Sequence, residues 1–245
     1  MDEPVVLLVE DDALVSRFVG MVLDDLPVRL QVCSSVEQAL QFLAEHRVQL
    51  VITDLMMPGE SGMGLIQRMA ADRSLAADAK VVVFSAGLNT KVREQLASMN
   101  IWRTLAKPAS VGDLQGCVRD ALQLAGQSPP PAPPPAPAAL AVEGLAEHET
   151  LAVATHFANN RRLFESYRER CFLQFPKDRA EGDRAAAVAD LAALRRLAHN
   201  LRTVLLTLGR SEGHQVASRL EEAACAEDVP ASVAGWKALR DHLSA

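Results

Sequence analysis

The stretch LVITDL (residues 50–55) decides the fold of the first half of the chain. It is a short, almost wholly apolar run, typical of a strand buried on both faces of a parallel sheet. Similar runs at 5–10, 29–33, 80–86 and 103–107 alternate with amphipathic stretches near 13–26, 35–46, 61–72, 89–99 and 110–124. This alternation predicts an α/β fold, a doubly wound five-stranded parallel sheet with helices on both faces.

Polar side chains follow four of the predicted strands: Glu10 and Asp11 the first, Asp54 the third, Ser85 the fourth and Lys107 the fifth. The carboxyl ends of parallel strands meet at one edge, where ligands bind in such folds. Carboxylates gathered there repel one another, and a hard cation such as Mg²⁺ relieves that repulsion. Carboxylates, Mg²⁺, a lysine and a hydroxyl together provide what phosphoryl transfer requires. One aspartate at a strand end is usually a solvated cap, but the coincidence of four strand ends argues against that interpretation.

Four motifs carry a resemblance to a known family: LLVEDD (7–12), DLMMPGESG (54–62), FSA (84–86) and AKP (106–108). Over about residues 3–126 the chain resembles the receiver domain of two-component response regulators. The resemblance implies that Asp54 accepts the phosphoryl group, that Ser85 binds a phosphoryl oxygen and that Lys107 pairs with the phosphorylated carboxylate. It also implies a flavodoxin-like strand order of 2-1-3-4-5.

The resemblance further implies a Mg²⁺ site formed by Glu10, Asp11, Asp54 and the backbone carbonyl of Met56. By the same register Asp12 is not a direct ligand of the cation. The peptide bond before Pro108 is expected to be cis, as at other tight turns.

Two departures from the family pattern have predicted consequences. An aromatic residue usually stands three positions before the lysine, whereas this chain has Thr104 there and Trp102 two residues earlier, so the usual aromatic switch is in doubt. The positions that help to place a hydrolytic water are Met56 and Gly87, whose side chains cannot orient one. We therefore expect a long-lived phosphoaspartate.

A proline-rich segment, SPPPAPPPAPAAL (128–140), separates the two halves. Proline lacks an N–H donor and fixes φ, so this segment favours extended polyproline II. We expect a receiver domain at 1–126, a spacer at 127–139 and an all-α bundle at 140–245. A ligand for a proline-binding groove is the less favoured interpretation of the segment. Helical patterns follow near 151–158, 160–175, 179–187, 190–208, 211–226 and 231–243.

The segment LAHNLRTVLLTLG (197–209) contains a histidine in a helical pattern. One apolar stripe is formed by Leu194, Ala198, Leu201, Leu205 and Leu208. His199 lies off this stripe, so it is expected to be exposed, with Arg202 near it and with Thr203 and Leu206 on its face. Asp190 is the expected N-cap of the helix, and Gly209 is expected to stop it.

This segment resembles the signature of histidine phosphotransfer (HPt) domains, and a looser likeness extends over about 140–245. The resemblance implies that His199 carries a phosphoryl group and that Arg202 assists it. Thr203 and Leu206 are bulkier than the residues usual at their positions, so they are expected to restrict or weaken docking.

The combination predicts a phosphorelay protein with a sensor histidine kinase and a downstream receiver as partners. The rival hypothesis is a phosphorylation-switched regulator whose bundle is a non-catalytic docking or dimerisation module.

No ATP-binding motif of a kinase is evident, so we do not expect an enzyme in the usual sense. The net charge of −6 argues against nucleic acid as a partner. Scattered cysteines, and the lack of an apolar run of about 20 residues, predict a cytoplasmic protein without membrane association.

Overall fold

A computed structural model describes residues 3–72, 75, 79–86, 90–97, 99–123 and 145–244. The chain divides into two compact units, Met1–Pro137 and Ala138–Ala245. The predicted spacer at 127–139 lies outside the described residues, and so does Gly87. Each unit is therefore considered by itself.

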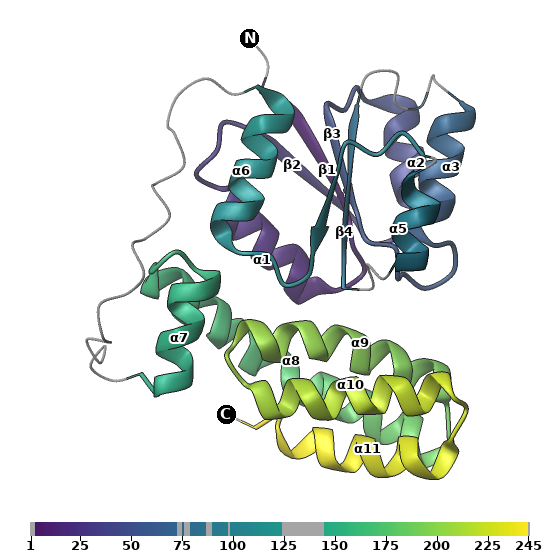
Figure 1. The fold of residues 1–245 in the computed structure, drawn as a ribbon, viewed down its shortest axis with the longest axis vertical. Helices are drawn as coiled ribbons and strands as arrows, with labels where there is room; N and C mark the ends of the chain where they lie inside the picture. Colours follow the sequence, from purple (N-terminus) through teal and green to yellow (C-terminus); the bar gives the residue numbers. More distant parts are fainter. Residues whose placement is uncertain are drawn as a thin grey trace. The chain divides into compact units, whose positions relative to one another are not determined.

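The first unit is the predicted doubly wound sheet (Figure 1). All strand pairs are parallel and the order is β2-β1-β3-β4-β5, as expected. The strands are β1 (Val5–Val9), β2 (Arg29–Cys33), β3 (Leu50–Thr53), β4 (Lys80–Ser85) and β5 (Arg103–Ala106). The helices are α1 (Ala13–Leu23), α2 (Val36–Glu45), α3 (Gly62–Ala71), α5 (Thr90–Ala97) and α6 (Val111–Leu122).

The central strands are buried on both faces, which explains their continuous apolar runs. Helices α2, α3 and α5 cover one face and α1 with α6 the other (Figure 1). Val5, Leu7 and Val9 point into the core under the first group of helices. Because side chains alternate along a strand, Val6 and Leu8 point to the opposite face, and they are equally buried.

The two edge strands of the sheet carry polar groups. On β2 the Gln31 side-chain amide donates to the Val32 carbonyl at 3.0 Å, and Arg29 is exposed. On β5 the Arg103 guanidinium lies 3.0 Å from the Asp120 carboxylate of α6. Such side-chain contacts and charges make a strand edge less available for pairing with another chain.

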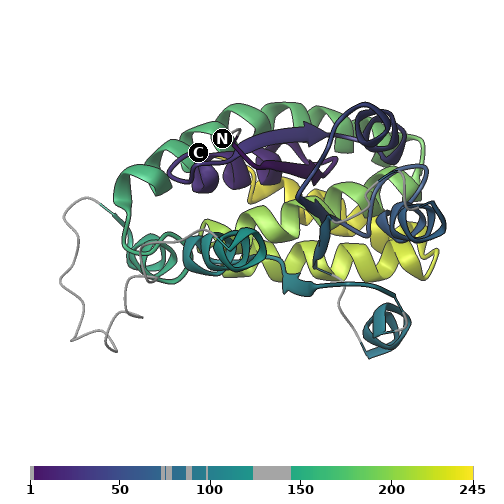
Figure 2. The same cartoon turned by 90° about the horizontal axis from the view of Figure 1, so that it is seen from above.

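The second unit is helical, with α7 (Glu147–His156), α8 (Arg161–Ala187), α9 (Leu191–Thr207), α10 (Ser211–Cys225) and α11 (Val229–Asp241). Helices α8 to α11 lie side by side (Figures 1 and 2), and α10 packs most closely on α9. The predicted stripe of α9, from Leu194 to Leu208, is buried. Asp190 caps this helix through the Ala193 amide at 3.0 Å, and Gly209 follows it with φ +78°.

One helix prediction was wrong. Separate helices were expected at 160–175 and 179–187, but α8 continues through Pro176. A proline inside a helix removes one hydrogen bond. Here Pro176 lies on the exposed side, while the buried side runs on through Phe175 and Gly182 to Ala185. Packing along that side compensates for the local defect.

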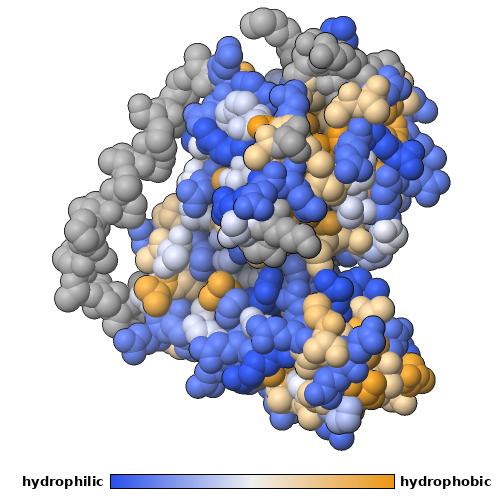
Figure 3. Space-filling model, turned by 45° about the vertical axis from the view of Figure 1, so that its right-hand side comes forward, coloured by the Kyte–Doolittle hydropathy of each residue, from blue (hydrophilic) through white to orange (hydrophobic). Residues whose placement is uncertain are grey.

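The exposed large apolar residues are scattered, and in Figure 3 most orange areas border polar ones. They include Leu151, Leu173 and Val188. Among the described helices, none combines the length and the apolar character needed to cross a bilayer.

Candidate functional site

The carboxyl edge of the sheet brings the predicted polar residues together. The Lys107 ammonium donates to Asp54 Oδ2 at 2.6 Å and also to Glu10 Oε2. The Ser85 hydroxyl is hydrogen-bonded to the Asp54 carboxyl group. The side chains of Lys107, Glu10 and Asp54 are at most 3% exposed. The peptide bond between Lys107 and Pro108 is cis, which confirms that prediction.

The loop after β3 fixes the second oxygen of Asp54. Asp54 Oδ1 accepts hydrogen bonds from the amides of Leu55 (2.5 Å) and Met56 (3.1 Å). Gly62, the first residue of α3, packs directly against this loop, because a Cβ atom there would lie 1.8 Å from the Asp54 carbonyl oxygen. Asp54 is therefore fixed at two points, its side-chain Oδ1 and its backbone carbonyl oxygen.

Burial and charge oppose each other in this cluster. Burial raises the pKa of Asp54, but the Lys107 charge and its hydrogen bond outweigh burial, so the pKa lies below its ordinary value. Burial dominates at Glu10 and raises its pKa to about 8, although Lys107 acts in the opposite direction. Burial lowers the pKa of Lys107, yet the two carboxylates outweigh it and raise this pKa, so the lysine stays charged. Asp54 is thus an ionised carboxylate beside a fixed cation.

The neighbouring acids differ in what they bind. Asp12 Oδ1 accepts hydrogen bonds from the amides of Leu14 (2.7 Å) and Val15 (3.1 Å), so this side chain is the N-cap of α1. Asp11 Oδ1 is buried and has no hydrogen-bond partner in the described part of the chain. A buried carboxylate oxygen without a partner fits an oxygen-liganded cation. Within the same residues no three metal-binding side chains surround one point, and the Lys107 ammonium contacts both Glu10 and Asp54.

The two residues named before Lys107, Thr104 and Trp102, have different surroundings. Thr104 is half-buried, whereas the Trp102 ring contacts two cations, with Lys80 Nζ 5.1 Å and Arg103 Cζ 4.4 Å from its centroid.

On α9 the structure corrects one expectation and adds a residue. His199 is 5% exposed rather than solvent-facing. Its Nδ1 lies 2.8 Å from Glu221 Oε1, and Arg202 Nη1 lies 3.0 Å from Glu221 Oε2. The physical reason is that α10 packs against the side of α9 that contains His199, which the sequence pattern predicted to face solvent. Thr203 is therefore buried as well.

Sequence reasoning missed Glu221. It stands 22 residues after His199 on another helix. Helix α10 also contains Glu212 and Glu222, and its sequence alone does not show which carboxylate faces α9. Burial raises the pKa of Glu221, but hydrogen bonding and charge from His199, with help from Arg202, outweigh burial and lower it. Glu221 is therefore an ionised acceptor, and a hydrogen bond across this 2.8 Å contact requires a proton on Nδ1 of the imidazole.

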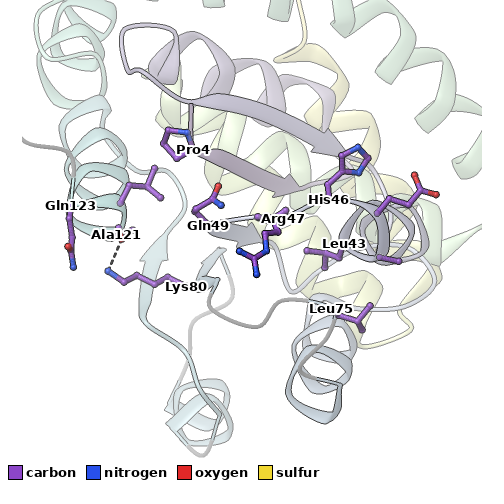
Figure 4. Close-up of a pocket in the computed structure, with 13 residues that line it drawn as sticks. Pro4, Leu43, His46, Arg47, Gln49, Leu75, Lys80, Ala121 and Gln123 are labelled. Carbon is purple, nitrogen blue, oxygen red and sulfur yellow. Dashed lines mark hydrogen bonds between the residues drawn. The ribbon is translucent and has the colours of Figure 1, made fainter. Parts of the chain in front are cut away.

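A cavity of about 510 Å³ lies at the amino end of the strands (Figure 4), at the other edge from the carboxylate cluster. Two polar side chains that line this cavity already form hydrogen bonds with backbone groups. Gln49 Oε1 accepts from the Val5 amide at 2.7 Å, and Lys80 Nζ donates to the Ala121 carbonyl at 2.7 Å. This cavity is therefore not the candidate site.

A parallel sheet of order 2-1-3-4-5, with acidic side chains, a hydroxyl and a lysine at its carboxyl edge, defines a flavodoxin-like doubly wound domain. Residues 6–119 match the family described as the response regulator receiver domain, and the chain belongs to this family. Receiver domains are signalling modules, so this half of the chain functions in two-component signal transduction.

The relatives and the solved structure described next each match about half of this chain. The two-component response regulator ORR12 of Oryza sativa subsp. japonica is 31% identical over 115 residues, which is 46% of this chain and 94% of that protein. The sensor histidine kinase TmoS of Ectopseudomonas mendocina is 30% identical over 123 residues, which is 50% of this chain but only 12% of the kinase. A solved signal receiver domain of a putative Luxo repressor protein from Vibrio parahaemolyticus has a TM-score of 0.47 at 24% identity. The match covers 49% of this chain and 91% of the solved chain.

Proposed function

We propose that this chain is a phosphorelay protein in which Asp54 and His199 carry phosphoryl groups between a sensor histidine kinase and a downstream receiver. The observation that supports the proposal is that one chain carries two side chains with the chemistry to accept a phosphoryl group. Asp54 is an ionised carboxylate beside Lys107, and His199 is an imidazole whose Nδ1 is held by Glu221.

The first step takes place at the receiver edge. An Asp54 carboxylate oxygen attacks phosphorus, and the bond from phosphorus to the donor's leaving atom breaks. Lys107 and the Ser85 hydroxyl are placed to neutralise and bind phosphoryl oxygens. Bound Mg²⁺ would supply further neutralisation of phosphoryl charge. Glu10, Asp11, Asp54 and the Met56 carbonyl would hold it, and the unpartnered Asp11 oxygen supports that assignment.

The second step uses the imidazole of His199. With the proton on Nδ1 and donated to Glu221, the lone pair lies on Nε2, which has no hydrogen-bond partner in the described part of the bundle. Nε2 attacks phosphorus, and the bond between phosphorus and the aspartate oxygen breaks, which restores the carboxylate. Arg202 holds the second Glu221 oxygen at 3.0 Å and so fixes the orientation of the pair.

One observation favours the rival function. His199 is buried, and its contact with Glu221 ties α9 to α10. A bundle that serves only as a docking or dimerisation module would use the same contact for stability alone. The two functions differ in whether the histidine ever carries phosphate.

The deciding experiment labels the full-length protein with a small phosphodonor and Mg²⁺, then separates base-stable phosphohistidine from base-labile acyl phosphate. Asp54→Ala should remove the acyl phosphate. His199→Gln should remove the base-stable label, while His148→Gln, a change at an exposed histidine of α7, should keep it. Circular dichroism verifies that each variant is folded. A folded His199→Gln protein that retains the base-stable label refutes the relay.

Glu221→Gln supplies a second comparison. Glutamine keeps the shape of the acceptor but loses its charge, and a charge-assisted hydrogen bond contributes about 1.5–3 kcal/mol. We expect phosphate transfer to His199 to slow roughly tenfold or more while the label at Asp54 is unchanged. An unchanged transfer rate would refute the role given to Glu221 and leave the relay itself standing.

A further inference from the structure

The Trp102 ring contacts two cations at the amino end of the sheet. Lys80 at the start of β4 lies over its ring at 5.1 Å, and Arg103 at the start of β5 lies at 4.4 Å. The Trp102 amide also donates to the Val81 carbonyl at 2.8 Å. Both cations lie within the range of a cation–π interaction, so the three side chains form one packed group.

Both cations also bind the last turn of α6. Lys80 Nζ donates to the Ala121 carbonyl at 2.7 Å (Figure 4), and the Arg103 guanidinium lies 3.0 Å from Asp120. The final carbonyls of a helix have no partner within the helix, and positive charge is favourable at that end. Trp102 therefore orients the two side chains that complete α6.

This group lies where the receiver ends. Gln123 caps α6 with φ 53° and is the last described residue before the segment that leads to the second unit. A change in the group would alter the helix end from which the chain continues.

The same two strands extend from this group to the phosphoacceptor. Strand β4 begins with Lys80 and ends with Ser85, while β5 follows Trp102 and leads to Lys107. The strands are paired along their length, from Val82 opposite Arg103 to Ser85 opposite Ala106. Five residues of strand span roughly 16 Å, so a shift of Lys107 has a short and hydrogen-bonded route to Trp102.

We propose that Trp102, Lys80 and Arg103 form a clamp that transmits phosphorylation of Asp54 to the end of α6. The inference rests on the proposed function for Asp54. Lys107 now binds the Asp54 carboxylate, and the added phosphoryl oxygens draw its ammonium outward and β5 with it. Trp102 and Arg103 then withdraw from Lys80 and Asp120, and the last turn of α6 loosens. The chain thus uses Trp102 where Thr104 cannot act as an aromatic switch.

The first test reads the clamp by fluorescence in the full-length Trp236→Phe protein, where Trp102 is the sole tryptophan. Acetyl phosphate with Mg²⁺ is the phosphodonor, and mass spectrometry gives the occupancy of Asp54. We expect Trp102 emission to change in proportion to that occupancy, and the same donor to leave the emission of the Asp54→Ala variant unchanged. Full occupancy without a change in emission overturns the clamp and leaves the assignment of Asp54 intact. No label on Asp54 refutes the proposed function, and the coupling with it.

The second test measures amide hydrogen exchange at Arg119–Leu122. Phosphorylation should speed exchange there about tenfold, and Lys80→Met or Arg103→Met should do the same in the unphosphorylated protein, because each removes a charged partner of the helix end. Arg17→Met, a change at an exposed residue of α1, is the matched control and should have no effect there. Equal exchange in all of these variants would overturn the clamp even if Asp54 is fully labelled.

Discussion

Gly62→Ala tests whether the packing beneath Asp54 is required. A Cβ atom at Gly62 would lie 1.8 Å from the Asp54 carbonyl oxygen and 2.7 Å from Thr53 Oγ1. The first of these atoms belongs to the backbone, so α3 or the loop after β3 must move by more than roughly 1.5 Å to reach an ordinary contact. Overpacking of this kind costs about 1–3 kcal/mol. The helix preference of alanine offsets at most about 1 kcal/mol, and less at the first helical position.

The assay is urea unfolding of the receiver unit, followed by Trp102 fluorescence in the Trp236→Phe background. Gly62→Ala should lower the free energy of unfolding by about 2 kcal/mol and slow labelling of Asp54 roughly 100-fold, since a displacement of 1 Å has that effect on group transfer. Gly116→Ala is the matched control, because nothing lies within 4 Å of its Cβ position in α6. It should stabilise the unit by about 0.5–1 kcal/mol and leave labelling unchanged. A Gly62→Ala protein of normal stability and labelling rate would refute the reasoning.

Three further predictions concern charge, packing and the lifetime of the phosphate. Lys107 holds the pKa of Asp54 low, so this carboxylate stabilises the folded receiver above about pH 4 and loses that effect on acidification. Lys107→Met removes the charge and the hydrogen bond that lower the pKa of Asp54 most, so this pKa should rise and the gain in urea midpoint above about pH 4 should shrink. Gly182→Ala should lower the melting temperature of the bundle, because its Cβ would lie 2.1 Å from the Trp236 ring. Met56→Asn should shorten the half-life of acyl phosphate several-fold, as measured by loss of label, because an amide can orient water.

The sheet and its site were predictable because each depends on local sequence. Buried parallel strands give apolar runs, and the polar residue after each run lies at the carboxyl edge of the sheet. Asp54, Ser85 and Lys107 meet there as expected. The hydrogen bond from Lys107 to Glu10 was not predicted. The order of residues along the strands does not show which of several carboxylates the ammonium reaches.

The bundle was less predictable for two physical reasons. A helical pattern places His199 relative to the core stripe of its own helix, but it does not show that α10 covers the adjacent flank with Glu221. Pro176 indicates a helix end in isolation, whereas tertiary packing carried α8 through it. Long-range packing decided both cases.

The protected edges of the receiver sheet bear on self-association. An open strand edge with unpaired backbone groups is a template for pairing with another chain and for aggregation. On β2, Gln31 binds the Val32 carbonyl and Arg29 adds an exposed charge, while on β5 Arg103 is paired with Asp120. Copies of a protein that meet in solution can pair through an open sheet edge. These two edges let such copies crowd together without joining into a continuous sheet.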